Sequence, residues 1–264
     1  MTADRRQKLL ELVRSQGFSS LPALADALDV SESTIRRDLA HLEKEGAAKR
    51  THGGAFYTGA SPQLAHFRQR QAAQWDKKRA IAELAAKTLE HADSVLLDGG
   101  STTYELARLL VERPLQVVTN SLPVANLFSP QPNIDLIMVG GYVHSSSGVI
   151  HGAYADEMLK SLGVRAAVIS AAGVSDGGLY NSSHMLATTQ LAMASAADEV
   201  IAVVDSTKFG RQSLASICQL SSISRLITDD GLTDEWRDKI ESAGAEVLVA
   251  AAEQPSQAVA DSSE

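Results

Sequence analysis

The stretch "VSESTIRRDLAHLEKEG", residues 30–46, combines an apolar stripe with a polar face that carries two adjacent arginines. Ile35, Leu39 and Leu42 recur at spacings of four and three, which gathers them on one face of a helix at 100° per residue. The segment therefore predicts a helix that docks through its apolar side and turns its polar side outward. The outward side would hold Ser33, Arg37 and Lys44, with Arg36 at its flank.

The sequence also marks the ends of this helix and two helices before it. Ser31 is a natural N-cap, and Gly46 suits a C-terminal stop. A first helical stripe ends near Gly17, and a second lies over residues 21–28. We expect three short helices at the N-terminus.

A short helix, a tight turn and a second helix that begins with hydroxyls and arginines is the arrangement that enters the DNA major groove. Arginine reaches guanine O6 and N7 there. An arbitrary arginine pair is more often a solvated face of a helical bundle. The continuation "AAKRTHGGA", residues 47–55, favours DNA, because a hairpin-like wing would press Lys49 and Arg50 on the backbone beside the helix.

The chain has 264 residues, a formal net charge of -8 and 44% hydrophobic residues, which allows a large core and two domains. Residues 1–57 carry nine Lys and Arg against eight Asp and Glu, so the rest holds 15 positive and 24 negative side chains. The acidic excess belongs to the later part and can face away from DNA.

Composition also indicates the compartment. The single cysteine, Cys218, excludes an intramolecular disulfide framework, and the first residues scatter charges where a secretory signal needs an apolar run. The longest apolar stretch, residues 166–174, is shorter than the roughly 18 residues of a membrane helix. We expect a cytoplasmic protein with no membrane span.

The change of pattern along the chain predicts the domains. We expect a DNA-binding domain over residues 1–57, a linker over 58–76, an α/β domain over 77–250 and a disordered tail over 251–264. From residue 77 helix-like and strand-like runs alternate, which predicts a mostly parallel sheet flanked by helices. Polar residues and glycines end or follow the apolar runs, at the sheet edge where open α/β folds bind ligands. They are Asp98, Asn120, Gly140, Gly141, Gly173 and Asp205.

The segment "LLDGGSTTYELARLL", residues 96–110, is the sharpest ligand signal. Its glycines clear space, and Ser101, Thr102 and Thr103 offer hydroxyls and N–H groups where a helix begins, which favours an anion such as phosphate. Such a turn taken alone is more often just a capped connection. It matches neither a Walker A nor a dinucleotide-binding pattern. "VVDSTKFG", residues 203–210, adds Asp205 and Lys208, where a lysine can neutralise a ligand's charge.

The quoted segments together resemble the DeoR family of bacterial transcriptional regulators over nearly the whole chain up to about residue 250. The resemblance implies a winged helix-turn-helix domain and a sensor domain similar to the ribose-phosphate isomerase and CoA-transferase sheet. It implies a double-stranded DNA operator, a phosphorylated sugar or related effector, and a homodimer or homotetramer that represses carbohydrate uptake or catabolism genes. The implied DNA contacts are Ser31, Ser33, Thr34, Arg36, Arg37, Arg50 and His52, beside Lys49 from the wing.

The resemblance also implies the residues of an effector pocket. They are Asp98, Gly100, Ser101, Thr102, Thr103, Asn120, Gly140, Gly141 and Lys208. The sequence departs from the family pattern at two places, where His144 replaces a basic residue and the helix over residues 187–197 lacks a carboxylate. Tyr180 and Asn181 offer further contacts.

Three other functions compete with a regulator. A sugar-phosphate isomerase would use Asp98, Asp205 and Lys208 in acid/base work, but a DNA-binding domain would be an odd appendage to it. A metal site lacks paired histidines or cysteines. A structural interaction module leaves the polar loops without a purpose. We therefore expect a regulator that is not an enzyme and needs no cofactor or metal.

Overall fold

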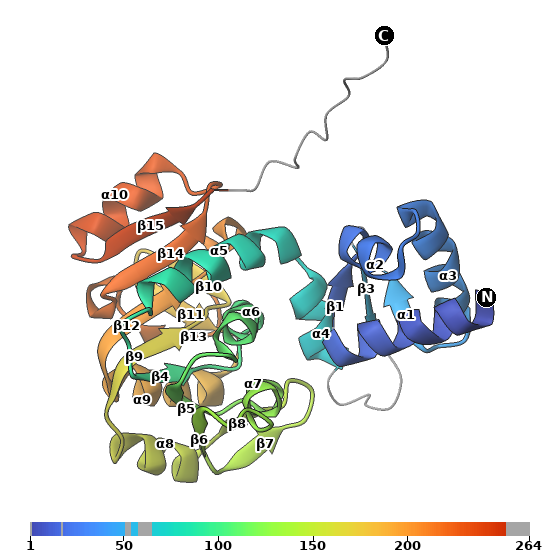
Figure 1. Ribbon diagram of the computed structural model, residues 1–264. Coiled ribbons are helices and arrows are strands. Elements are labelled where there is room, and N and C mark those ends of the chain that lie inside the picture. The colour runs from blue at the N-terminus through green and yellow to red at the C-terminus, as the bar shows by residue number, and fades with distance from the viewer. Residues whose placement is uncertain (1, 17, 51–53, 58–64, 252–264) are drawn as a thin grey trace.

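The computed structural model describes residues 2–16, 18–50, 54–57 and 65–251, which form a small N-terminal lobe and a larger lobe with one helix between them (Figure 1). In the small lobe Ile35, Leu39 and Leu42 are buried against Leu9 and Val13, which confirms the predicted apolar face. Three strands pair antiparallel in the order β1-β3-β2. The elements are α1 (Thr2–Gln16), β1 (Phe18–Ser20), α2 (Leu21–Leu28), α3 (Glu32–Lys44), β2 (Ala48–Arg50) and β3 (Gly54–Tyr57).

The larger lobe is built on a seven-stranded sheet in the order β15-β14-β12-β9-β4-β5-β6, and every adjacent pair is parallel. This confirms the predicted α/β architecture. The strands are β4 (Ser94–Leu97), β5 (Leu115–Thr119), β6 (Ile134–Met138), β9 (Val164–Ile169), β12 (Ala197–Val203), β14 (Arg225–Asp229) and β15 (Glu246–Ala250).

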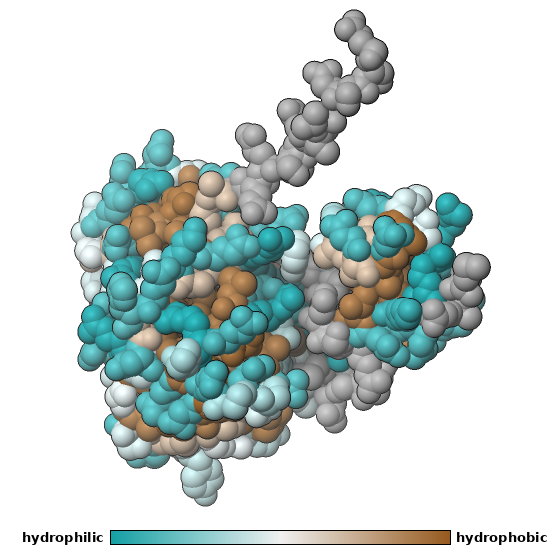
Figure 2. Space-filling view, viewed as in Figure 1, coloured by the Kyte–Doolittle hydropathy of each residue, from teal (hydrophilic) through white to brown (hydrophobic). Residues whose placement is uncertain are grey.

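Helices cover both faces of this sheet. Val95 and Leu97 of β4 pack with α5 and α6, whereas Leu96 between them packs with α8 and α9, as the alternation of side chains along a strand requires. In Figure 2 the outer surface of α5 is hydrophilic. The helices are α5 (Trp75–Thr88), α6 (Ser101–Leu110), α7 (Leu122–Phe128), α8 (Ala153–Lys160), α9 (His184–Ser195) and α10 (Asp234–Ser242).

Other elements were not predicted from the sequence. Antiparallel strands β10 (Gly173–Ser175), β11 (Gly178–Asn181) and β13 (Ala215–Cys218) form a second sheet, and β7 (Tyr142–His144) and β8 (Val149–His151) form a hairpin. Two short 3-10 turns are η2 (Ser206–Lys208) and η3 (Leu220–Ser222). A helix, α4 (Ala65–Ala72), lies inside the stretch predicted as a linker. The domain limits themselves stay a prediction.

Candidate DNA interface and effector cavity

The start of α3 is an exposed cluster of hydroxyls held by Ser31. The Ser31 Oγ accepts a hydrogen bond from the Thr34 N–H at 3.4 Å and lies 2.9 Å from Ser33 Oγ and 3.0 Å from Thr34 Oγ1. Ser31 therefore satisfies one of the free N–H groups at the helix start, as an N-cap does. The hydroxyl groups of the predicted DNA contacts Ser31, Ser33 and Thr34 therefore lie together at the N-terminal end of α3.

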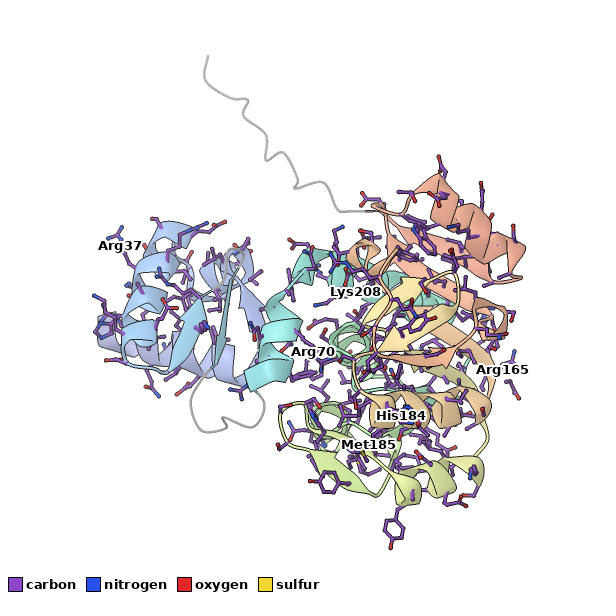
Figure 3. The ribbon with its side chains drawn as sticks, turned by 180° about the vertical axis from the view of Figure 1, so that it is seen from behind. Arg37, Arg70, Arg165, His184, Met185 and Lys208 are labelled. Atoms are coloured by element: carbon purple, nitrogen blue, oxygen red, sulfur yellow. The ribbon has the colours of Figure 1, made fainter. Side chains whose placement is uncertain are left out.

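The two predicted arginines of α3 are both exposed but differ in their partners. Arg36 Nη2 lies 3.3 Å from Glu32 Oε2, and both side chains are about half exposed, so this pair contributes little and can be exchanged for a phosphate. Arg37 makes no ion pair with any described residue, and Figure 3 shows it at the outer end of the small lobe, directed away from the larger lobe. Arg37 is therefore the less constrained of the two.

The wing strand β2 presents Lys49 outward and ties Arg50 to α3. Arg50 Nε donates to Glu43 Oε2 at 2.7 Å, and its backbone N–H donates to the other carboxylate oxygen at 3.2 Å. These bonds lower the pKa of Glu43, chiefly through the Arg50 side chain. Arg50 therefore anchors the wing to α3 in this structure. His52 lies outside the described residues.

A buried ion cluster, which the sequence interpretation missed, orients α3 on α1. Asp38 Oδ2 accepts from Arg5 Nε at 2.7 Å, and its Oδ1 accepts from Arg6 Nε at 3.1 Å. Burial alone would raise the pKa of Asp38, but the two arginines lower it overall. The sequence did offer one signal for this buried ion cluster, because Asp38 follows Ile35 by three positions and so lies on the apolar face of the helix.

The larger lobe contains a cavity of about 450 Å³ at the carboxyl ends of the central strands. Asp98 follows β4, Asn120 follows β5, Ser170 follows β9, and Asp205 follows β12. From β4 the chain adds β5 and β6 on one side of the sheet and then β9, β12, β14 and β15 on the other. The change of direction between β4 and β9 is the position where parallel sheets open a crevice for ligands. The predicted convergence of strand ends is confirmed for Asp98, Asn120 and Asp205, whereas Ser170 was not predicted and Gly173, which was, is not in the lining.

Some residues predicted for the effector site lie in this cavity and others do not. Its lining includes Asp98, Gly100, Ser101, Thr102, Asn120 and Lys208. Thr103 is fully buried outside the lining, and its hydroxyl donates to Asp98 Oδ1 at 2.6 Å, so it stabilises the loop between β4 and α6. Gly140 and Gly141 are not in the lining, which corrects the expectation that they line this pocket. Gly141 instead lets the chain pass the hairpin, because an added Cβ would lie 2.9 Å from Ile150.

Asp98 is a structural carboxylate whose oxygens are occupied by protein donors. Oδ1 accepts from Gly100 N–H at 2.8 Å and from Thr103. Oδ2 accepts from the backbone and side chain of Ser170 at 2.8 and 2.9 Å, and from Gln190 Nε2 at 2.7 Å. Asp98 thus joins the loop after β4 to β9 and α9. Gln190 lies on the helix over residues 187–197, where the sequence lacks a carboxylate.

Asp205 also serves its own loop. It accepts at 3.1 Å from the Thr207 N–H and from the Thr207 hydroxyl, and so caps η2, which carries Lys208. Two of the three residues that an isomerase would use as acid or base are therefore engaged by protein groups.

Two cations that sequence reasoning missed join Lys208 in the lining, namely Arg70 of α4 and Lys78 of α5. Burial lowers the pKa of Arg70, and its Nε has no hydrogen-bond partner in the described part of the chain. Burial lowers the pKa of Lys78 to about 8, and its Nζ donates to the carbonyls of Arg70 and Ala73. Figure 3 places Arg70 where α4 meets the larger lobe. Sequence reasoning missed Arg70 because it lies in the stretch predicted as a linker, and missed Lys78 because no local motif marks it.

The uncharged part of the lining offers both donors and acceptors. Asn120 Oδ1 is buried without a partner among described residues, while its Nδ2 donates to the Ile150 carbonyl at 2.8 Å. His144 also lines the cavity and lies 2.9 Å through Nδ1 from Ser147 Oγ. Asn181 lines it as well, whereas Tyr180 does not. The cavity thus combines three cations with amide, hydroxyl and imidazole groups.

No three His, Cys, Asp or Glu side chains of the described ranges gather into a group that could hold a metal ion. Over those ranges, no helix is both long and apolar enough to cross a membrane.

Comparison with known proteins matches two family models to separate parts of the chain. The DeoR-like helix-turn-helix domain matches residues 5–59, and the DeoR C terminal sensor domain matches residues 73–230. The HTH-type transcriptional regulator YulB of Bacillus subtilis (strain 168) is 34% identical over 88% of this chain and 90% of its own. A putative aga operon transcriptional repressor of Escherichia coli O157:H7 is 30% identical over 94% of each chain. An L-fucose operon activator of Haemophilus influenzae is 31% identical over 87% and 93%.

Among solved structures, a D-ribose-5-phosphate isomerase in complex with phospho-erythronic acid is similar at a TM-score of 0.37 and 21% identity, over 50% of this chain and 52% of the other. The beta subunit of eIF2B from Chaetomium thermophilum is similar at a TM-score of 0.42 and 13% identity, over 57% and 48%. Likenesses at these TM-scores support no further conclusion.

Proposed function

Because the chain belongs to the DeoR family of transcriptional regulators, we propose that it represses carbohydrate uptake or catabolism genes and leaves its operator when a phosphorylated sugar fills the cavity. The cavity with Arg70, Lys78 and Lys208 in its lining is the observation that carries the effector class, since three cations favour a phosphate. The amide and hydroxyl groups beside them suit the hydroxyls of a sugar.

The operator would be bound by the exposed face of α3 together with the wing. Arg37 reads a base edge in the major groove, Ser33 and Arg36 contact phosphate or base, and Lys49 contacts the backbone. One recognition helix covers one half-site, so a dimer or tetramer is required to occupy a symmetric operator. The protein would act in the cytoplasm, where the operator and the sugar phosphate are both present.

The sign of regulation is part of the proposal. One relative is named a repressor and another an activator, so family membership alone does not fix it. Release of DNA requires that the sugar phosphate bind the DNA-free arrangement more tightly, by about 1 to 3 kcal/mol for typical allosteric coupling.

We place the cavity's role in binding rather than turnover. Asp98 accepts hydrogen bonds from protein donors on both carboxylate oxygens, and Asp205 accepts two from Thr207 on Oδ1, which supports structural roles for these carboxylates rather than acid/base roles.

The test is fluorescence-anisotropy binding to DNA upstream of the protein's own gene, at fixed salt, with and without a panel of sugar phosphates. We expect sequence-dependent binding that one phosphate weakens, while its unphosphorylated sugar and a scrambled duplex of equal length serve as controls. If folded protein bound no fragment, and NMR showed one of these phosphates being isomerised, the proposal would be wrong and the isomerase reading would replace it.

A further inference from the structure

Helix α4 touches both lobes. It packs against β1 and β3 of the small lobe and against α6 of the larger one, and Figure 1 shows it between them. The Phe67 ring meets the Tyr104 ring edge-on, with centroids 5.3 Å apart. Gln71, which is fully buried, donates from Nε2 to Glu105 Oε1 at 3.0 Å. A shift of α4 on α6 would therefore be carried to β3, which pairs with the wing strand β2.

Residues 73 and 74 form the joint between α4 and α5, and hydrogen bonds from Lys78 hold it in place. Gln74 has φ 55° and ψ 38°, a left-handed conformation that residues with a Cβ seldom adopt unless their surroundings hold them there. Lys78 supplies that support, because its Nζ donates to the carbonyls of Arg70 and Ala73 and its backbone N–H donates to the Gln74 carbonyl at 3.1 Å. One side chain of α5 thus holds the end of α4.

The same joint lines the cavity. Arg70, Gln74 and Lys78 all belong to its lining. Two carbonyls use two of the three donors of the Lys78 ammonium, which leaves one for a ligand, and Arg70 Nε is unused. Burial lowers the pKa of Lys78, Asp205 raises it, and the neighbouring charges of Lys208 and Arg70 lower it, so an anion placed among the three cations would offset their mutual repulsion and favour the charged ammonium.

We propose that Arg70 and Lys78 form the subsite for the effector's anionic group, and that its occupancy resets the α4–α5 joint and so moves the wing. The inference rests on the proposed function and deepens it by naming how the cavity reaches the DNA-binding lobe. Arg70 and Lys78 bind the ligand directly, whereas Gln71 is a positioning residue that ties α4 to α6 through Glu105 while α4 carries the shift to the small lobe.

Inorganic phosphate is the probe for the subsite, and Trp75, next to the joint, is the reporter. The chain has two tryptophans, so Trp236→Phe leaves Trp75 as the single tryptophan, which is excited selectively at wavelengths that tyrosine does not absorb. We expect millimolar phosphate to shift the Trp75 emission and to weaken operator binding at least 5-fold, the lower end of typical coupling. Potassium chloride at equal ionic strength is the control for screening.

Variants in the Trp236→Phe background then separate binding from coupling. Arg70→Gln and Lys78→Met should each weaken phosphate binding at least 10-fold, while Lys87→Met, which removes an exposed lysine of the same helix α5, should not. Gln71→Met should bind phosphate like the parent but lose at least half of its effect on operator affinity. Thermal unfolding checks each fold, and Arg70→Gln decides the test if Lys78→Met does not fold.

Equal phosphate binding by Arg70→Gln and the parent would overturn the subsite. Parent-like coupling in Gln71→Met would overturn the route through α4. Both results leave the proposed function standing, because it fails on a different observation, the absence of sequence-dependent DNA binding by the wild type without phosphate.

Discussion

Helices α3 and α6 begin with similar residues and are used in opposite ways. "SESTIRR" opens α3 with exposed hydroxyls, and Ser31 caps the helix. "GSTTYEL" opens α6. Its N-cap residue is Gly100, so no side chain caps this helix, and the side chains of Ser101, Thr102 and Thr103 are buried, with at most 8% of each residue exposed. A capped, solvent-facing start suits a large partner such as DNA, whereas an uncapped start inside a cavity suits a small anion.

The reason for the difference lies outside both segments. An added Cβ on Gly100 would lie 1.9 Å from Ser170 Oγ, so the loop before α6 is pressed against β9. Among the residues that the structure describes, none packs in that way on the start of α3, where Ser31 and Ser33 are exposed. The surroundings, rather than the hydroxyls, decide which kind of site a helix start becomes.

The largest effect should come from removing the group that builds the start of α6. Asp98→Ala leaves the donors on Gly100, Thr103, Ser170 and Gln190 without an acceptor, so we expect the free energy of unfolding to fall by about 4 kcal/mol. Urea denaturation followed by tryptophan fluorescence measures it. The exposed Asp230→Ala is the matched control, and an Asp98 variant as stable as that control would contradict the structural role.

On the α3 side, Arg37→Ala should weaken operator binding by about 1 to 3 kcal/mol and relax specificity at one base pair. Lys49→Ala should instead weaken all duplexes alike and reduce the salt slope by about 1. Anisotropy titrations on operator and scrambled DNA at several salt concentrations distinguish the two. A uniform loss from Arg37→Ala would make Arg37 a phosphate contact.

The cavity should depend on pH through Lys78, whose pKa of about 8 lies below its ordinary value of 10.5. Burial, Lys208 and Arg70 lower this pKa, while Asp205 and Glu105 raise it. Sulfate, whose charge is constant over this range, should bind roughly tenfold more weakly at pH 9 than at pH 7, because Lys78 has lost most of its proton.

The same titration acts on stability with the opposite sign. The unfolded chain keeps the Lys78 proton between about pH 8 and 10.5, so this residue makes the free energy of unfolding rise with pH across that window. Isothermal titration calorimetry and urea denaturation at each pH measure the two trends. Sulfate binding by Lys78→Met that still fell tenfold would assign the effect to another group.

The smallest effect tests the two helix starts directly. Ser31→Ala removes an N-cap, so the small lobe should lose about 1 kcal/mol in its free energy of unfolding. Ser101→Ala removes no cap and should change stability by less than about 0.5 kcal/mol. Urea denaturation followed by circular dichroism compares them, and equal losses would remove the contrast between capped and uncapped starts.

Local pattern was enough for the elements that carry the fold. The apolar spacing of Ile35, Leu39 and Leu42 predicted the buried face of α3, and the alternation of helix-like and strand-like runs after residue 77 predicted the parallel sheet. The short strands of the second sheet and the β7–β8 hairpin were missed because three- and four-residue strands carry no clear period. Gly140 and Gly141 were expected in the effector pocket, but this glycine pair leads from β6 into the β7–β8 hairpin, and a glycine pair after a strand is compatible with either position.

The sequence by itself determined the two lobes, the outward face of α3 and the family, because these depend on periodicity and on long local motifs. Only the tertiary structure decided that Asp98 is held by Ser170 and Gln190, and that Arg70 and Lys78 line the cavity beside Lys208. These groups come from segments far apart in the chain. Burial and hydrogen-bond partners, which no local spacing encodes, give each of them its role.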